Sequence, residues 1–197
     1  MFNQRIEDIE KLIRGRVGKK ITREGRFIPA AVMMILKEIG NAEYSILFIK
    51  RPQNAEDVFA GHMAFPGGKK KGEDQTILDT AIRETLEETG IDISKDGRIL
   101  GELDDFNPIN PKANHYVVTP FVSLLMKDTE IKPNEEVDEA VWIPLNHLKD
   151  EKSLEIRILE RSSMRVKDYV FYYRDYVIWG MTGRILRDFL SLTGHLL

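Results

Sequence analysis

The sequence predicts an α/β fold in which a mixed β-sheet is flanked by helices. Helix-like and strand-like segments are intermixed along the chain without the regular βαβ alternation of a barrel. With 197 residues, 42% of them hydrophobic, the chain can bury a substantial core. No repeat, low-complexity tract or proline-rich linker divides it. Residues 1–197 are therefore expected to form a single domain.

Two terminal helices are expected as additions to this domain. Apolar side chains recur at helical spacing near the start of the chain, at Phe2, Ile6, Ile9 and Ile13. They predict a helix over about residues 1–16 whose apolar stripe covers the core. An amphipathic pattern predicts a closing helix over about residues 182–192. Charged residues interrupt the N-terminal pattern, which argues against a signal peptide or a membrane span and predicts a cytoplasmic protein.

Several segments have the composition of β-strands. The first two, Phe27–Leu36 and Tyr44–Lys50, are expected to be joined by a turn at Gly40-Asn41. The others are Arg98–Leu103, Tyr116–Leu125, Val137–Ile143 and Tyr169–Val177. A short helix is expected from Pro144 onward.

Composition narrows the classes of function. Lys and Arg total 29 against 32 Asp and Glu, so the formal charge is only -3. No broad basic field is available to hold a nucleic acid, and a small-molecule partner is expected instead. The chain has no cysteine, which excludes disulfides, thiolate metal sites and cysteine nucleophiles.

The most informative segment is an acidic helix, expected to begin near Asp74 or Thr76 and to end near Thr89, before Gly90. On a helical wheel the acidic side chains fall within an arc of about 100°. They are Glu84, Glu87 and Glu88, and the adjoining face is expected to pack through Leu78, Ala81, Ile82, Thr85, Leu86 and Thr89. The carboxylates repel one another, and no Lys or Arg is expected on that face to offset this. A divalent cation would do so, whereas a solvated acidic surface is the alternative.

A glycine-rich loop precedes this helix. It contains Phe65-Pro66-Gly67-Gly68, in which the proline stiffens the chain and the glycines permit close approach of other groups. A backbone carbonyl or amide of the loop can therefore meet the same metal or phosphate as the helix.

Together the loop and helix, Gly61–Gly90, resemble the signature of the Nudix hydrolases. The family pattern is a glycine, five residues, a glutamate, seven residues and Arg-Glu. Here Gly68 is followed by five residues, Asp74, eight residues and Arg83-Glu84. The resemblance implies a Nudix-type α/β/α sandwich and hydrolysis of a diphosphate bond in a nucleotide-like substrate.

The resemblance also implies roles for individual residues. In the family the arginine braces the loop and helix by pairing with a carboxylate, and Arg83 has its position. Asp74 or Glu73 stands in place of the first glutamate. The metal, Mg²⁺ or Mn²⁺, would be held by Glu84, Glu87, Glu88 and a backbone atom of Gly68. Arg83 and Glu87 are therefore expected to be catalytic.

Two features resemble the coenzyme A pyrophosphatase branch of the family. One is the loop Gly61-x3-Phe65-Pro66-Gly67-Gly68 with an acidic residue six positions after its second glycine, and the other is the segment Val177–Leu186, which is similar to the WGxT segment of that branch. In that case the products would be 4'-phosphopantetheine and adenosine 3',5'-bisphosphate. The branch also expects an arginine where Asp57 stands, and a segment after Arg51 that is one residue shorter. ADP-ribose, dinucleoside polyphosphates and damaged nucleotides remain alternative substrates. A non-catalytic, nucleotide-sensing Nudix domain is an alternative of another class.

The resemblance does not fix the base that activates the attacking water. The first candidate is Glu136, and Glu139 and Glu135 rank second and third. Glu136 is preferred because it lies where a loop that begins at Pro133 leads into a strand. Loop solubility explains these residues equally well.

Residues in and before the glycine loop are expected to contact the substrate. They are Lys50, Arg51, Phe65, Gly67 and Lys69. The run Lys69–Lys71 is also explained as solvated surface. The aromatic residues Tyr172, Tyr173, Tyr176 and Trp179 either stack a base or pack a sheet face. The four histidines lack metal-ligand spacing. A homodimer is expected from the family resemblance alone.

Overall fold

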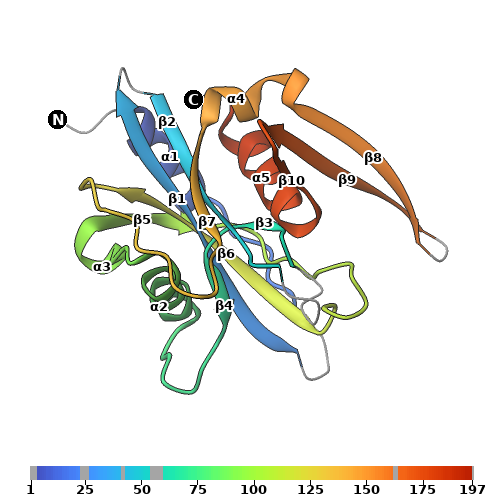
Figure 1. The fold of residues 1–197 in the computed structure, drawn as a ribbon, viewed down its shortest axis with the longest axis horizontal. Coiled ribbons are helices and arrows are strands. Elements are labelled where there is room, and N and C mark those ends of the chain that lie inside the picture. Colours follow the sequence, from blue (N-terminus) through green and yellow to red (C-terminus); the bar gives the residue numbers. More distant parts are fainter. Residues whose placement is uncertain (1–3, 23–26, 41–42, 54–59, 162–163, 197) are drawn as a thin grey trace.

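The central element of the fold is a seven-stranded mixed sheet. The computed structural model describes residues 4–22, 27–40, 43–53, 60–161 and 164–196 (Figure 1). The strands of this sheet are β1 (Ile28–Gly40), β2 (Glu43–Lys50), β3 (Met63–Ala64), β4 (Gly67–Lys69), β5 (Gly97–Glu102), β6 (Tyr116–Leu125) and β7 (Glu139–Pro144). The main path runs β3-β2-β1-β6-β5, with β4 beside β1 and β7 beside β2. Strands β1 and β6 are parallel, and the other pairs are antiparallel.

Both faces of this sheet are buried, as the alternation along β1 shows. Ala31, Met33 and Ile35 belong to one core cluster, which includes residues of α2 (Ile77–Thr89) and α3 (Ile93–Asp96). Val32 and Met34 belong to the other, which is covered by α1 (Gln4–Arg14), α4 (Leu145–Lys149) and α5 (Gly180–Thr193). Figure 1 shows α2 and α3 on the opposite side of the sheet from α5. The expected α/β/α sandwich is therefore confirmed. No helix in the described ranges is long and apolar enough to cross a membrane.

A second, three-stranded antiparallel sheet was not expected. It comprises β8 (Leu154–Arg161), β9 (Met164–Tyr173) and β10 (Tyr176–Ile178), and it follows the short 3-10 helix η1 (Glu151–Ser153). The single strand expected over Tyr169–Val177 was wrong, because the chain turns at Arg174, where φ is 52°.

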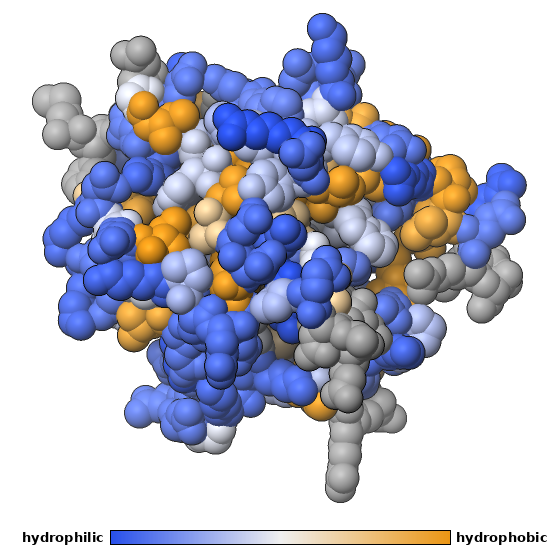
Figure 2. Space-filling model, in the orientation of Figure 1, coloured by the Kyte–Doolittle hydropathy of each residue, from blue (hydrophilic) through white to orange (hydrophobic). Residues whose placement is uncertain are grey.

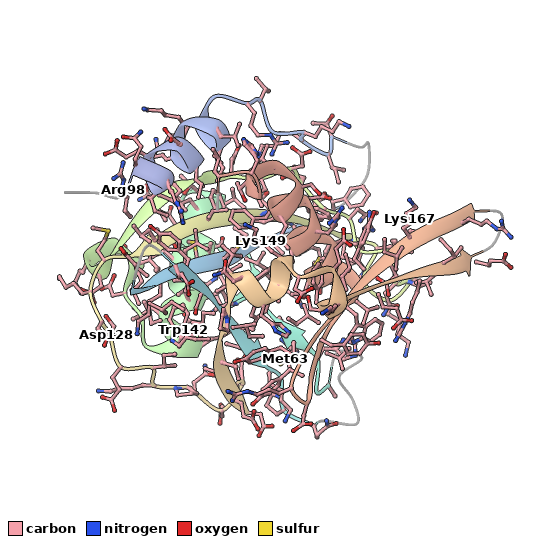
Figure 3. The ribbon with its side chains drawn as sticks, turned by 90° about the horizontal axis from the view of Figure 1, so that it is seen from above. Met63, Arg98, Asp128, Trp142, Lys149 and Lys167 are labelled. Carbon is pink, nitrogen blue, oxygen red and sulfur yellow. The ribbon has the colours of Figure 1, made fainter. Side chains whose placement is uncertain are left out.

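The hairpin of β8 and β9 extends beyond the rest of the molecule (Figure 3). Ile156 and Ile158 of β8 are 50% and 53% exposed. The face in Figure 2 is mostly hydrophilic, with apolar surface in small separate patches. Strand β8 was missed because charged residues separate its apolar ones and because these are only half buried.

Smaller differences concern the ends of elements. Strand β1 continues to Gly40, which pairs with Glu43 of β2, so this strand is longer than the expected Phe27–Leu36. Asn41 of that expected turn lies outside the described residues. Strand β7 begins at Glu139 and not at Val137. Elements β3, β4 and α3 were not expected because two to four residues give no readable periodicity.

Helix α5 approaches β9 closely at Gly183. A Cβ atom there would lie 2.1 Å from the carbonyl oxygen of Tyr169, and a backbone atom cannot move aside as a flexible side chain can.

We therefore expect Gly183→Ala to destabilise the protein by about 1–3 kcal/mol through overpacking, despite the better helix propensity of alanine. Urea unfolding measures the change. Gly72→Ala is the control, because nothing lies within 4 Å of a Cβ at Gly72. Equal stability of both variants would contradict the close contact.

Candidate active site

Helix α2 is capped at both ends by its own sequence. The hydroxyl of Thr76 accepts a hydrogen bond from the backbone N–H of Asp79, and the Asp79 carboxylate accepts one from the N–H of Thr76. At the other end Gly90 has φ 74° and donates its N–H to the carbonyl of Leu86. Thr76, and not Asp74, is thus the N-cap, which leaves the Asp74 carboxylate for other contacts.

Asp74 forms a two-pronged ion pair with Arg83. The guanidinium Nε and Nη2 each lie 2.9 Å from a different carboxylate oxygen. The same carboxylate accepts from the Lys71 backbone N–H at 2.8 Å and from the Thr80 hydroxyl at 2.9 Å. The guanidinium holds the pKa of Asp74 well below its usual range. Loop and helix are therefore joined at one buried carboxylate.

Arg83 also reaches the acidic face of the helix. Its Nη1 donates to Glu84 at 2.6 Å and to Glu87 at 3.2 Å, and its Nη2 donates to the carbonyl of Lys69 at 3.2 Å. Lys71 lies 3.3 Å from the Glu87 carboxylate. The expectation that no basic residue offsets these carboxylates was wrong. The side chain of Arg83 is long enough to reach Glu84 and Glu87 along the helix surface.

One residue of the expected packing face lies elsewhere. Leu86 is 44% exposed, because the sheet covers only the part of α2 that carries Ala81 and Thr85. The expectation that Leu86 packs was wrong.

The glycine loop lies directly on two of the glutamates. The N–H of Gly67 donates to Glu88 Oε2 at 2.8 Å. A Cβ at Gly67, where φ is 156°, would lie 2.2 Å from the carbonyl oxygen of Ala31. A Cβ at Gly68 would lie 2.6 Å from the carboxyl carbon of Glu84. A larger residue at Gly67 would therefore collide with β1, and one at Gly68 would collide with the Glu84 side chain of α2.

Glu88 is a buried carboxyl whose charge is poorly compensated. It is 2% exposed, and burial raises its pKa to about 8. The hydrogen bond from Gly67 opposes this rise, while the nearby charge of Glu84 adds to it. Smaller effects come from Arg51, which lowers the pKa, and from Glu136, which raises it. The charges of Arg51 and Glu136 therefore act on Glu88, although Glu136 itself is exposed.

The donors present fit a hard divalent cation. Glu84 and Glu88 are one helical turn apart beneath the loop, and their mutual repulsion is what such an ion would relieve. In the part of the chain that the structure describes, no three His, Cys, Asp or Glu side chains form a ready-made cluster. The Glu87 carboxylate is held by Arg83 and Lys71. Two carboxylates with water and substrate oxygens suffice for Mg²⁺.

Glu88 lies at the wall of a cavity of about 650 Å³. The glycine loop and the first residues of β1 and β6 form part of the wall. Further parts come from the segment that carries Pro108 and Lys112, from the start of α5, and from Leu159 and Asp168 of the second sheet. A cavity of this size accommodates a ligand as large as a nucleotide derivative.

The expected site residues divide into two groups around this cavity. Those that line it are Arg51, Phe65, Gly67, Gly68, Lys69 and Glu88. Those outside its lining are Lys50, Arg83, Glu84, Glu87 and Glu136. Lys50 instead lies 3.2 Å from Asp138 and 3.4 Å from Glu139. Asp57 lies outside the described residues.

Of the four aromatic residues considered for base stacking, only Trp179 lines the cavity. Its ring centroid is 4.6 Å from that of His62. The hydroxyl of Tyr172 is bonded to Glu155 and Arg157, and that of Tyr176 to Glu139.

Sequence reasoning did not assign three further cavity-lining residues, namely Lys112, Asp168 and Arg184. No periodicity or spacing marks them, since separate loops and strands bring them together.

Comparison with known proteins gave consistent matches. The model of the NUDIX domain family matches residues 27–161. The Nudix hydrolase NudL of Photorhabdus laumondii is 33% identical over 130 residues, which cover 66% of this chain and 67% of that protein. NudL of Yersinia pestis is 32% identical over 159 residues, covering 80% and 76%. A MutT/nudix family protein from Enterococcus faecalis superposes with a TM-score of 0.53 at 17% identity, covering 91% of this chain and 64% of that one.

Replacing Asp74 by Asn should destabilise the protein by about 3 kcal/mol at neutral pH, because it removes one partner of a buried ion pair. The folded-state pKa of Asp74 lies below its unfolded value. Its stabilisation is therefore present above about pH 4 and is lost as the pH falls further.

Urea unfolding at neutral pH and at about pH 3 measures both effects. Glu73→Gln, at the exposed neighbouring residue, is the control and should change stability little. A difference between wild type and the Asp74 variant that stays constant down to low pH would contradict the assignment.

Proposed function

Because the chain belongs to the Nudix hydrolase family, we propose that it hydrolyses the diphosphate bond of coenzyme A or a coenzyme A derivative, using Mg²⁺ or Mn²⁺. The observation that carries the proposal is the composition of the cavity wall. The glycine loop and Glu88 lie in one part of it, and Trp179, Met181 and Thr182 lie in another. The segment that resembles the coenzyme A branch therefore borders the same cavity as the Nudix loop.

The metal would be held by Glu84, Glu87, Glu88 and the backbone of Gly68. A divalent ion bound there supplies charge neutralisation and polarises the phosphates. Glu88 is supported by its burial and by its hydrogen bond to Gly67. Glu87 would join only by giving up its contacts with Arg83 and Lys71.

Arg83 acts as a positioning residue in this proposal. Its ion pair with Asp74 and its bond to the carbonyl of Lys69 fix the loop relative to the helix. The loop then presents Gly67 and Gly68 to the diphosphate, with backbone groups that need no reorganisation during the reaction.

The positive charges at the cavity bind the diphosphate. Arg51 and Lys69 line it, and Phe65 forms part of its wall. Lys50 would contact a phosphate only by leaving Asp138 and Glu139, so we rank it below the other two.

We propose that Glu136 takes the proton of the attacking water. The water attacks one phosphorus, and the bond from that phosphorus to the bridging oxygen breaks. The effect of Glu136 on the pKa of Glu88 supports its nearness to the site.

We propose that residues 1–197 form one domain, because the C-terminal segment and the Nudix loop both line the cavity. A homodimer remains a proposal from family resemblance. A non-catalytic sensing domain is disfavoured because Glu84, Glu87 and Glu88 are all present.

Glu88→Gln should lower kcat by at least about 100-fold, as removal of a preorganised charged group commonly does. Stability should be unchanged or slightly higher, because Gln can still accept the Gly67 hydrogen bond and burying it removes no charge from water. Steady-state kinetics and urea unfolding measure the two effects. Glu130→Gln, at an exposed residue, is the control. A Glu88 variant with wild-type turnover would exclude its role.

The reaction itself is tested with a panel of coenzyme A, ADP-ribose, dinucleoside polyphosphates and oxidised nucleotides, with products identified by mass. We expect coenzyme A to give the highest kcat/KM and to yield 4'-phosphopantetheine. Chelation should abolish turnover, and Mg²⁺ or Mn²⁺ should restore it. Higher kcat/KM for another compound would reject the substrate preference. Nucleotide binding without any hydrolysis would favour the sensing domain.

A further inference from the structure

The cavity wall carries more basic side chains than the proposed reaction uses. Among the described residues, it is lined by Arg51, Lys69, Lys112 and Arg184 and by the carboxylates of Glu88 and Asp168. The proposed reaction uses Arg51, Lys69 and Glu88. Lys112 and Arg184 have no part in it.

Lys112 and Arg184 also lack the ion pairs that other basic residues form. Arg16, Lys20, Lys37 and Arg83, for example, each lie within 4.0 Å of a carboxylate. Within the described ranges, neither Lys112 nor Arg184 has an acidic group at such a distance. Among the described residues, folding therefore leaves these two cations at the cavity wall without an ion pair.

Two acidic residues bear on the charge around Arg184, and in the described part of the chain neither forms an ion pair with it. Asp188, one turn further along α5, has a pKa raised by burial, an effect that Arg184 only partly opposes. Asp168 is 5% exposed and accepts the backbone N–H of Gly180 at 3.2 Å. Its carboxylate is thus committed to the first turn of α5, where a negative charge is favourable.

Both cations line one cavity, and the chain around Phe106 connects their positions. The Arg184 guanidinium lies over the ring of Phe106, 5.8 Å from its centroid. Phe106 pairs with Val118 of β6, which also lines the cavity. Lys112 lies on the loop that connects Phe106 to β6, and its neighbours Ile109 and Asn110 are part of the same wall. Arg184 therefore covers the start of the loop that carries Lys112.

We propose that Lys112 and Arg184 form a second anion subsite, which binds a phosphate monoester that the substrate carries in addition to its diphosphate. An arginine can bind phosphate through two parallel N–H bonds, and a lysine adds a mobile point charge. The substrate class is then a nucleoside diphosphate derivative with a further phosphate on its ribose. The inference rests on the proposed function in taking this cavity as the substrate site.

Calorimetric titration in the presence of EDTA tests the subsite without turnover. The probes are adenosine 3',5'-bisphosphate and 5'-AMP, which differ only in the additional phosphate. We expect wild type to bind the bisphosphate at least about tenfold more tightly, an advantage that Lys112→Gln/Arg184→Gln should lose. Equal affinities in wild type, or an advantage retained by the double variant, would overturn the subsite.

Two matched variants control for general effects of charge and folding. Arg187 also lies on α5 and also stacks on an aromatic ring, 5.8 Å from the centroid of Tyr169, but it is not part of the cavity wall. Lys167 is an exposed lysine on the projecting hairpin (Figure 3). Arg187→Gln and Lys167→Gln should keep the preference for the bisphosphate. Loss of the preference in either would show a nonspecific charge effect and overturn the proposal.

Kinetics with coenzyme A and 3'-dephospho-coenzyme A separates this inference from the proposed reaction. If both hold, the double variant loses kcat/KM for coenzyme A and keeps it for the dephospho compound. If neither compound is hydrolysed but the bisphosphate preference depends on Lys112 and Arg184, the subsite stands and the reaction is wrong. If wild type hydrolyses both compounds equally, the reaction stands and the subsite is wrong.

Discussion

The site depends on the ion pair between Arg83 and Asp74. These residues belong to different segments, and each charge is costly to bury without the other. Asp74 also accepts the backbone N–H of Lys71, and Arg83 also donates to the carbonyl of Lys69. The pair therefore fixes strand β4, which contains both glycines, as well as the helix. With that strand in place, Gly67 can donate to Glu88 and Gly68 can lie against the Glu84 carboxylate. A change at Arg83 should act on the site through these contacts.

The same arrangement leaves the charge of the Glu88 carboxylate poorly compensated. Glu88 is buried beside Glu84, and its raised pKa means that ionisation of its carboxyl group is unfavourable. A divalent cation at this position would favour the charged form, whereas a hydrogen bond from Gly67 alone does not restore the normal pKa. Elsewhere on the wall, Lys112 and Arg184 provide positive charge, and neither is ion-paired to a carboxylate of the described residues. A cavity that is negative at a proposed metal position and positive around it suits a metal-bound polyanion.

Much of the fold could be predicted because long elements carry a strong pattern. The run of apolar residues that forms β1 and the capped, amphipathic helix α2 were readable from composition and spacing. Strand β8 was not, because half-exposed Ile156 and Ile158 stand between charged residues and resemble a solvated loop. The carboxylates of the site were readable from their spacing on one helix and from family resemblance. Their contacts were not, since the reach of Arg83 to Glu87 depends on side-chain direction. Lys112 left no signal, and Arg184 was readable only as part of the segment that resembles the coenzyme A branch, because tertiary packing alone brings their segments to one cavity.

The central claim is that Glu84 and Glu88, held beneath the glycine loop, bind a divalent cation. The most direct measurement is the anomalous scattering of Mn²⁺ soaked into crystals of the wild-type protein. The account predicts an anomalous peak within bonding distance of carboxylate oxygens of Glu84 and Glu88, close to the backbone of Gly68. An anomalous peak that lies beside other residues only would contradict the account. So would the absence of a peak beside these carboxylates after soaking at a saturating Mn²⁺ concentration.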